Sequence, residues 1–552
     1  MKHRMVALAL LSALATAASA TAPSATSASA VTTASVSVAS GGPAPAQVTS
    51  PGTGPRPPGP LQPPRPPRPP RPTPPTSPPG AADGEAWAWT QLTGRGTQIR
   101  YVSTDTSRQC PSVRYTLGTA GDTHQMHRVS TPMGAQFPTT VCELGVPLTA
   151  SGARLEQVPA AVLHPGDRRL PLPGWTSVTR PERIAVIGDT GCSVPKTGTV
   201  QNCANHQTGW PFPTIADSAA TVTRPDLVIH VGDYLYRDDP DRENDKQRNP
   251  GCTTTADAAS WACVVADFFR PAETLLAGAP VALTRGNHED CNASFHGGAG
   301  GAWFRYLADE LRDDGSCDRF TDPVAIRAGL LNLVSLDSSS ADPADNGSTA
   351  DKAVFTRQFD QVNQYAQRRP GEDFFLFTHK PLWMVKAAGH TTGDVTWLTR
   401  VLGDAVADTA LHRLARNVRL VLSGHVHLYQ MVDFDTVRPP QLTVGSSGGP
   451  LDNGPDDLLV LGQPVGTPPQ AVHQSITQTV GPTGGTGIAG YADLGHGSAG
   501  TTWVLTFRTT DGRVLGPTCR LDTSAADKSF LCPPGTPTGP GGDRPGGYGA
   551  AR

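Results

Sequence analysis

Five short apolar runs in this chain each end in a small polar cluster, and this repeated pattern limits the fold more than any other feature of the sequence. An apolar run closed by a glycine turn is typical of a buried strand. Open α/β folds bind their ligands at the carboxyl edge of such strands, so we expect the five clusters to meet there. The clusters are Gly188-Asp189-Thr190-Gly191, Val231-Gly232-Asp233-Tyr234-Leu235-Tyr236, Gly286-Asn287-His288-Glu289, Thr378-His379 and Gly424-His425-Val426-His427.

The polar residues of these clusters are of the types that bind metal ions, and one carboxylate, that of Asp233, could bridge two cations. Anionic oxygen donors form a hard, negatively charged pocket that suits a trivalent ion such as Fe(III), whereas neutral donors suit a divalent ion. The first group is Asp189 and a deprotonated Tyr236 with His427, and the second is Asn287, His379 and His425. Which ligand binds which ion does not follow from the spacing alone.

The ten cysteines predict disulfide bonds. An even number without Cys-x-x-Cys pairs is typical of an oxidising compartment rather than of a zinc site. Pairing between sequence neighbours is the simplest arrangement, for example Cys192 with Cys203 and Cys252 with Cys263. The net charge of only -3 does not indicate a surface for nucleic acid.

Residues 1–20 predict a secretory signal peptide, because basic residues precede a short apolar run and small residues follow it. The run is short for a bilayer span, and no later segment is expected to cross a membrane. Residues 21–85 are rich in Ser, Thr and Ala and then in Pro and Arg, which predicts a disordered polyproline-II stalk. Such a stalk would hold an exported protein away from a cell envelope. The alternatives are a partner that docks on the prolines, or contact of the arginines with an anionic wall polymer.

The remaining residues predict a small β domain followed by an α/β catalytic domain. Residues 86–181 hold short alternating runs between turns, which are typical of β-strands. In residues 182–521 strands alternate with helical patterns, such as Phe355, Phe359, Val362 and Ala366, and this predicts two sheets covered by helices, an αββα sandwich. Residues 522–552 are Gly/Pro-rich and predict a disordered tail. Strands are expected at residues 183–187, 227–230, 281–284, 331–336, 374–377, 420–422, 503–507 and 514–521, and a helix over 397–414.

The five clusters resemble those of the metallophosphoesterase (calcineurin-like) superfamily and, within it, the purple acid phosphatases. Many relatives carry His two residues after the first Asp, where this chain has Gly191. The purple acid phosphatases also have Gly there and gain a Tyr three residues after the bridging Asp, as Tyr236 follows Asp233. The resemblance covers residues 183–429 well and the N-terminal third hardly at all.

By this resemblance the chain holds a dinuclear centre of Fe(III) and a divalent ion, which is Fe, Zn or Mn. His288, next to a ligand, is placed to act as the general acid. The family also places phosphate-binding histidines after the fourth cluster, where this chain offers one, His390. The implied ligands are Asp189, Asp233, Tyr236 and His427 for the ferric ion, and Asp233, Asn287, His379 and His425 for the divalent ion.

The function that these residues indicate is a secreted phosphatase that hydrolyses phosphomonoesters by attack of a metal-bound hydroxide. A phosphodiesterase or nucleotidase on the same metals is the nearest alternative, because the clusters define the chemistry better than the substrate. A cell-envelope binding module, built on the β domain and the stalk, is an alternative of another class, and the complete ligand set argues against it.

Overall fold

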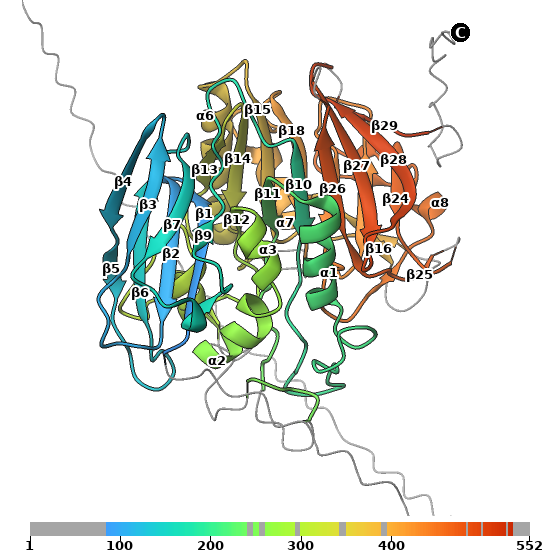
Figure 1. The fold of residues 1–552 in the computed structure, drawn as a ribbon. Helices are drawn as coiled ribbons and strands as arrows, with labels where there is room; N and C mark the ends of the chain where they lie inside the picture. Colours follow the sequence, from blue (N-terminus) through green and yellow to red (C-terminus); the bar gives the residue numbers. More distant parts are fainter. Residues whose placement is uncertain are drawn as a thin grey trace, which may run out of the picture. The chain divides into compact units, whose positions relative to one another are not determined.

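Two β-sheets face each other across an apolar layer, and helices cover the outer face of each sheet (Figure 1). This computed structural model describes residues 84–239, 247–252, 260–292, 299–341, 349–387, 395–481, 484–497, 501–525 and 528–533. Val186 and Ile229 from one sheet are buried in the same core as Leu333 and Leu422 from the other. This arrangement confirms the predicted αββα architecture.

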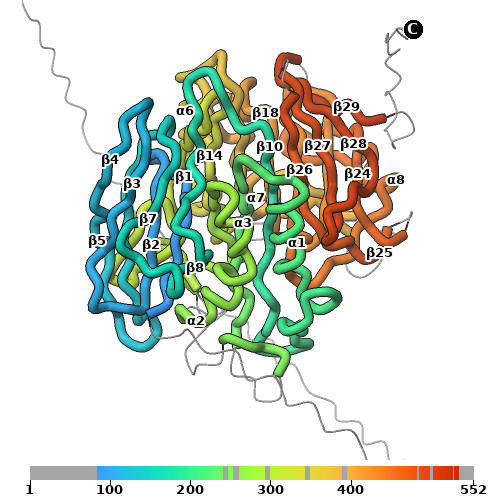
Figure 2. The backbone as a smooth tube through the Cα atoms, viewed as in Figure 1, coloured from blue at the N-terminus to red at the C-terminus, as the bar shows by residue number. Residues whose placement is uncertain are grey.

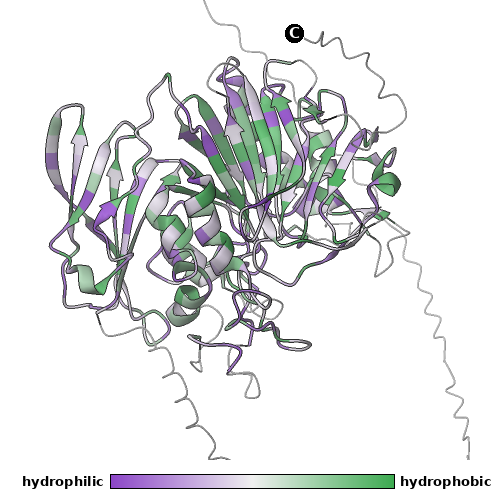
Figure 3. Ribbon diagram, turned by 45° about the vertical axis from the view of Figure 1, so that its right-hand side comes forward, coloured by the Kyte–Doolittle hydropathy of each residue, from purple (hydrophilic) through white to green (hydrophobic). Residues whose placement is uncertain are grey.

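The first sheet has a parallel centre made of β10, β11 and β12. These strands are almost entirely buried, because the second sheet covers one face and helices cover the other. In the ribbon of Figure 3 the strands at the centre of the sandwich are coloured mainly as hydrophobic residues. In hydrogen-bonding order the strands are β29 (Phe530–Leu531), β28 (Val514–Asp522), β27 (Thr502–Thr509), β26 (Gly490–His496), β10 (Arg183–Ile187), β11 (Leu227–His230), β12 (Val281–Leu283), β1 (Ala86–Thr93), β2 (Gly96–Ser103), β6 (Thr140–Val146) and β5 (His127–Ser130), with β8 (Leu163–His164) beside β1.

The helices on the outer face of the first sheet are short, and their apolar side chains pack on β10, β11 and β12. Several run on into single turns of π-helix. They are α1 (Phe212–Ser218), η2 (Ala219–Thr223), α2 (Trp261–Val264), η4 (Val265–Phe269), α3 (Glu273–Gly278), α5 (Gly300–Ala302) and η5 (Trp303–Leu307).

The second sheet also has a parallel centre, β14, β15 and β18, and packs against α6 (Thr349–Gln367) and α7 (Arg400–Asp408). The apolar stripe of α6 from Phe355 to Ala366 is buried there, as the helical spacing predicts. The helix expected over 397–414 is shorter, since α7 ends at Asp408. In order the strands are β13 (Val324–Ala328), β14 (Leu331–Leu336), β15 (Asp373–Thr378), β18 (Val418–Ser423), β20 (Gln441–Val444), β19 (Tyr429–Asp433) and β24 (Gln474–Thr477).

The region 86–181 is built of β-strands, as expected, but its strands join the catalytic sheet instead of forming a separate domain. β1 pairs with β12 in parallel, with Gln91 opposite Val281. Figure 2 shows these N-terminal strands, in blue, at one end of the molecule and the C-terminal strands at the other. A smaller sheet packs on them through its own apolar cluster. Its strands are β4 (Ala120–Gln125), β3 (Ser112–Leu117), β7 (Ser151–Glu156) and β9 (Arg169–Leu170).

The cysteines form five disulfides, each between sequence neighbours, as expected. The catalytic domain was expected to end at residue 521, but the folded chain continues to β29. The disulfide between Cys519 and Cys532 holds β29 against β28. The pairs are Cys110–Cys142, Cys192–Cys203, Cys252–Cys263, Cys291–Cys317 and Cys519–Cys532. The minor elements are η1 (Ala160–Val162), α8 (Asp457–Val460), and the strand pairs β16 (Val385–Ala387) with β17 (Val395–Trp397), β21 (Asn453–Gly454) with β25 (Gly485–Thr486), and β22 (Pro464–Val465) with β23 (Gln470–Ala471).

Several expectations concern residues outside the described ranges. The signal peptide of residues 1–20, the stalk up to residue 83, the tail beyond residue 533 and His390 all lie there. Within the ranges that the structure describes, none of the helices has the length and apolar character needed to cross a membrane.

His164 links the N-terminal strands to α3. Its ring nitrogens lie 3.2 Å from Glu273 Oε1 and 3.0 Å from Glu85 Oε1. Its ring stacks on Trp87 with the centroids 4.4 Å apart. The hydrogen bonds to Glu273 and Glu85 raise the pKa of His164 to about 9.

We expect the free energy of unfolding to fall by about 1–2 kcal/mol as the pH rises from about 7 to above 9, allowing for the partial exposure of His164. The folded-state pKa is raised, so the stabilisation is complete below the unfolded value of about 6.5 and is lost as the pH passes about 9. Urea unfolding at several pH values measures this. His164→Gln should flatten the dependence and His124→Gln, on β4, should keep it. Parallel curves for the wild type and His164→Gln would contradict the assignment.

Candidate active site

The ligand-bearing turns lie at the carboxyl ends of parallel strands and adopt unusual backbone conformations. Asp189, Asp233 and His425 all have positive φ angles, of 56°, 60° and 72°. Such angles are uncommon for residues other than glycine and concentrate at functional sites. Gly232 precedes Asp233 with φ 98°, and a Cβ there would lie 2.6 Å from His379 Nδ1. The turn before Asp233 therefore packs directly against the ring of His379, and a side chain at position 232 would not fit.

Glu289 holds two of these turns together. Its buried carboxylate accepts hydrogen bonds from the backbone amides of Asp233, Tyr234 and Leu235, at 3.2, 2.9 and 3.0 Å. It also accepts one from Gly286 N, at 3.1 Å, directly before Asn287. Glu289 is thus a structural anchor for the turns that carry the proposed ligands.

Tyr236 Oη is the centre of the first group of predicted ligands. It lies 2.7 Å from Asp233 Oδ2, 2.9 Å from Asp189 Oδ1 and 2.8 Å from His427 Nε2. His427 Nδ1 donates to the carbonyl oxygen of Pro450 at 2.6 Å. Burial lowers the pKa of His427, but Asp189 outweighs it and raises the pKa to about 9. Tyr236 Oη thus meets two carboxylate oxygens and an imidazole nitrogen, which are atoms of the types that bind a cation once it displaces their protons.

The pKa of Tyr236 is raised well above its usual value by burial and then by the carboxylates of Asp189 and Asp233. The phenol is therefore protonated in the absence of a cation. A metal ion that displaces this proton would gain an anionic oxygen ligand.

The second group of predicted ligands surrounds His379. His379 Nε2 lies 2.9 Å from Asn287 Oδ1 and 3.2 Å from Asp233 Oδ2, while its Nδ1 lies 2.9 Å from the carbonyl oxygen of Val231. Burial lowers the pKa of His379, but the carboxylate of Asp233 outweighs it and raises the pKa. Ligand atoms of Asp189, Asp233 and His379 lie within 4.8 Å of one another. A cation that displaced the proton on Nε2 would find imidazole, amide and carboxylate ligand atoms close together.

His425 lies beside this second group. Its ring centroid is 5.2 Å from that of His379, and its backbone amide donates to Asp189 Oδ2 at 3.0 Å. Asp233 contributes one oxygen near Tyr236 and His379 and keeps the other for the amide of His288, at 2.9 Å. The structure thus brings all seven predicted ligands together around one shared carboxylate.

His288 lies next to the ligands, and its ring is 4.0 Å from the ring of Tyr236. Its Nδ1 is 3.3 Å from Asp238 Oδ1. Burial lowers the pKa of His288, but the carboxylates of Asp233 and Asp238 outweigh it and raise the pKa to about 9. The imidazole therefore carries a proton over the acidic and neutral range, as a general acid requires.

Sequence reasoning did not identify Asp238, nor the ion pair of Arg237 with Asp267. Both members of the pair are buried, and Arg237 Nε donates to Asp267 Oδ1 at 2.6 Å. Asp267 also accepts from Tyr236 N at 3.1 Å and from Cys192 N at 3.3 Å, so it joins the first two ligand turns. Asp238 follows Arg237 in a polar stretch that reads as an exposed turn, and only the folded chain places it against His288.

Comparison with protein families gives one match, to the model described as calcineurin-like phosphoesterase, over residues 182–429. No curated protein matches the sequence. Among solved structures, one titled "Structure of PhoD" is 10% identical, with a TM-score of 0.47 over 83% of this chain and 93% of that chain. The family match spans all seven predicted ligands and His288. The family match and the grouping of the predicted ligands together support a metal-dependent phosphoesterase domain over residues 182–429.

Proposed function

We propose that this protein is an exported phosphomonoesterase with a dinuclear metal centre of the purple acid phosphatase type. The observation that carries the proposal is the position of Tyr236, whose phenol oxygen lies within 2.9 Å of Asp189, Asp233 and His427. A tyrosine three residues after the bridging Asp, together with glycine (Gly191) two residues after the first Asp, distinguishes this type from many of its relatives. The five disulfides support export to an oxidising compartment.

The two groups of ligands divide by charge. Asp189, Asp233, Tyr236 and His427 would hold a ferric ion, because three of the four are anionic oxygens once the phenol is deprotonated. Asp233, Asn287, His379 and His425 would hold a divalent ion, which is Fe, Zn or Mn. When bound, the two ions activate water for attack and neutralise the charge of the phosphoryl group.

The protein's own groups then supply position and a proton. The protonated imidazole of His288 gives its proton to the leaving alcohol, and Asp238, at 3.3 Å, orients the ring through Nδ1. The carboxylate of Glu289 accepts hydrogen bonds from four backbone amides and so holds the turns of Asp233 and Asn287 together. Contact of His390 with the substrate phosphate remains part of the proposal, since that residue lies outside the described ranges.

The comparison of a phosphomonoester with its matching diester tests the substrate class. We expect kcat/KM to be at least about tenfold higher for the monoester, because two cations and His288⁺ favour a dianionic phosphoryl group. An acidic optimum is expected because a ferric ion would lower the pKa of bound water, so that hydroxide is available at mildly acidic pH. A preference for the diester would keep the metal site and assign a phosphodiesterase or nucleotidase instead. Activity on neither, in protein that holds both metals by elemental analysis, would favour a cell-envelope binding module.

A further inference from the structure

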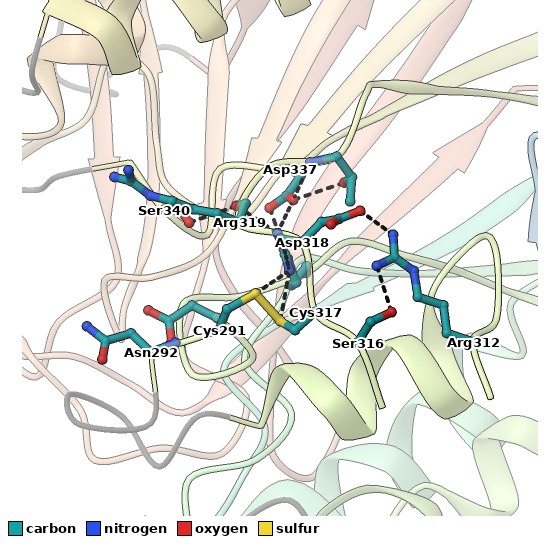
Figure 4. Close-up of a disulfide and its surroundings, with 12 residues drawn as sticks. Cys291, Asn292, Arg312, Ser316, Cys317, Asp318, Arg319, Asp337 and Ser340 are labelled. Atoms are coloured by element: carbon teal, nitrogen blue, oxygen red, sulfur yellow. Dashed lines mark hydrogen bonds and ion pairs between the residues drawn. A yellow bond between two sulfur atoms is a disulfide. The ribbon is translucent and has the colours of Figure 1, made fainter. Parts of the chain in front are cut away.

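A disulfide lies close to His288 in the sequence. Cys291, three residues after His288, is bonded to Cys317 in the chain that leads from η5 to β13 (Figure 4). All ten cysteines lie in the described ranges, and Cys291 is the one that is exposed; the others are buried or half-buried. The bond from Cys291 to Cys317 is therefore the most open to a thiol in solution.

Arg285 holds the far side of this disulfide. Its buried guanidinium pairs with Asp337, and Nη1 donates to the carbonyl oxygen of Asp318 at 2.7 Å and lies 4.0 Å from both sulfurs. Nη2 donates to the carbonyl oxygen of Arg319 at 3.0 Å, and the guanidinium lies over the ring of Phe304 at 5.0 Å. One rigid cation thus supports the backbone around Cys317 and the sulfurs themselves.

The backbone between His288 and the disulfide is closely packed. Ala299 N donates to His288 O at 3.2 Å, and Gly300 N donates to Asp290 O at 3.1 Å. A Cβ on Gly300 would overlap Cys317 Sγ and lie 2.7 Å from Asp290 O. Two thiols need more room than one disulfide, and Gly300 leaves little space beside Cys317 Sγ. Opening the bond would therefore displace Ala299 and Gly300, whose amides support the carbonyl groups of His288 and Asp290.

We propose that the Cys291–Cys317 disulfide is a redox latch that positions the general acid, so that oxidation switches the enzyme on and reduction lowers its activity. The inference rests on the proposed function, with His288 as the acid. A dithiol opens the latch when its thiolate attacks Cys291 Sγ, breaks the S–S bond and releases Cys317. Its second thiol then releases Cys291, so the dithiol is oxidised by two electrons and each cysteine ends with one proton.

The latch acts on His288 through Ala299, whose amide donates to His288 O at 3.2 Å. The proposed ligand Asn287 has a separate support, because the buried carboxylate of Glu289 accepts from Gly286 N at 3.1 Å and from the amides of the Asp233 turn. A displacement of about 1 Å at a reacting group costs on the order of a hundredfold in rate. Reduction should therefore slow esters of poor leaving groups, which need the proton, and spare esters of good leaving groups.

The test compares the full-length metal-loaded enzyme with the Cys291→Ser, Cys317→Ser double variant on an alkyl phosphate and on p-nitrophenyl phosphate. We expect kcat to fall about 10- to 100-fold on the alkyl phosphate and less than about threefold on the aryl phosphate. The matched control is Cys110→Ser, Cys142→Ser, which removes a buried disulfide of the N-terminal strands. It should lower Tm and leave the ratio of the two rates unchanged.

Titration of the wild type with a dithiol gives the same comparison without a variant and replaces it if the serine pair does not fold. Alkylation and peptide mapping identify Cys291 and Cys317 as the reduced pair, elemental analysis checks the metals, and reoxidation should restore the alkyl rate. Equal losses on both substrates, or an unchanged ratio, would overturn the latch alone. An oxidised wild type that hydrolyses neither substrate would overturn the proposed function instead.

Discussion

Asp233→Asn is expected to lower kcat/KM for a phosphomonoester by at least about a thousandfold, or ~4 kcal/mol of transition-state stabilisation. Asp233 is the only residue placed in both ligand groups, with Oδ2 near Tyr236 Oη at 2.7 Å and His379 Nε2 at 3.2 Å. An amide has one carbonyl oxygen and no charge, so it cannot offset two cations. The NH₂ group of the new asparagine would also replace one carboxylate oxygen that accepts a hydrogen bond or would bind a cation. Metal content per chain should fall together with the activity.

The matched control is Asp122→Asn, on the exposed strand β4, which removes the same charge far from the ligands in sequence and sheet. Its metal content and kcat/KM should equal those of the wild type. Full activity of Asp233→Asn with both metals still bound would contradict the shared carboxylate and, with it, the dinuclear centre. Loss of structure is checked by Tm, because Asp233 Oδ1 also accepts from His288 N.

The meeting of the seven proposed ligands could be predicted from the sequence, because each follows its own strand in a local pattern. β10, β11 and β14 begin and end at the predicted residues, and parallel strands bring their carboxyl ends to one edge. The disulfides were predictable for a similar reason, since each partner is a sequence neighbour. The anchoring role of Glu289 could not be decided, because a carboxylate in a turn looks the same whether amides or water surround it.

The features that the sequence does not reveal depend on contacts between distant segments. β1 pairs with β12, about 190 residues away in the sequence. An alternating apolar pattern predicts a strand but does not show which strand it pairs with. Asp267 joins the turns of Tyr236 and Cys192 from a π-helical turn, where helical spacing does not place it. The small β domain was expected from short alternating runs between turns, and such runs predict strands without showing which sheet they join.

His288→Ala is expected to slow an alkyl phosphate by about 10²- to 10⁴-fold and p-nitrophenyl phosphate by less than about tenfold, the range for loss of a general acid. In the absence of a cation, burial lowers the pKa of this imidazole, but Asp233 and Asp238 outweigh it and raise the pKa to about 9. Asp238 would remain its partner at Nδ1 when Asp233 binds metal. An alkoxide is a strong base that needs the proton as the P–O bond breaks, whereas nitrophenolate leaves without it. The measurement is kcat on both substrates, in saturating metal.

The matched control is His412→Ala, at an exposed histidine beyond α7 whose Nδ1 lies 2.8 Å from the carbonyl oxygen of Ala407. It should change neither rate. Equal losses on the two substrates by His288→Ala would mean that the imidazole binds the phosphate rather than protonating the alcohol. Asp238→Asn separates these readings further, because it keeps the ring beside Tyr236 and weakens only the partner at Nδ1. A smaller loss with the same preference for good leaving groups would mean that Asp238 orients His288 for the proton transfer.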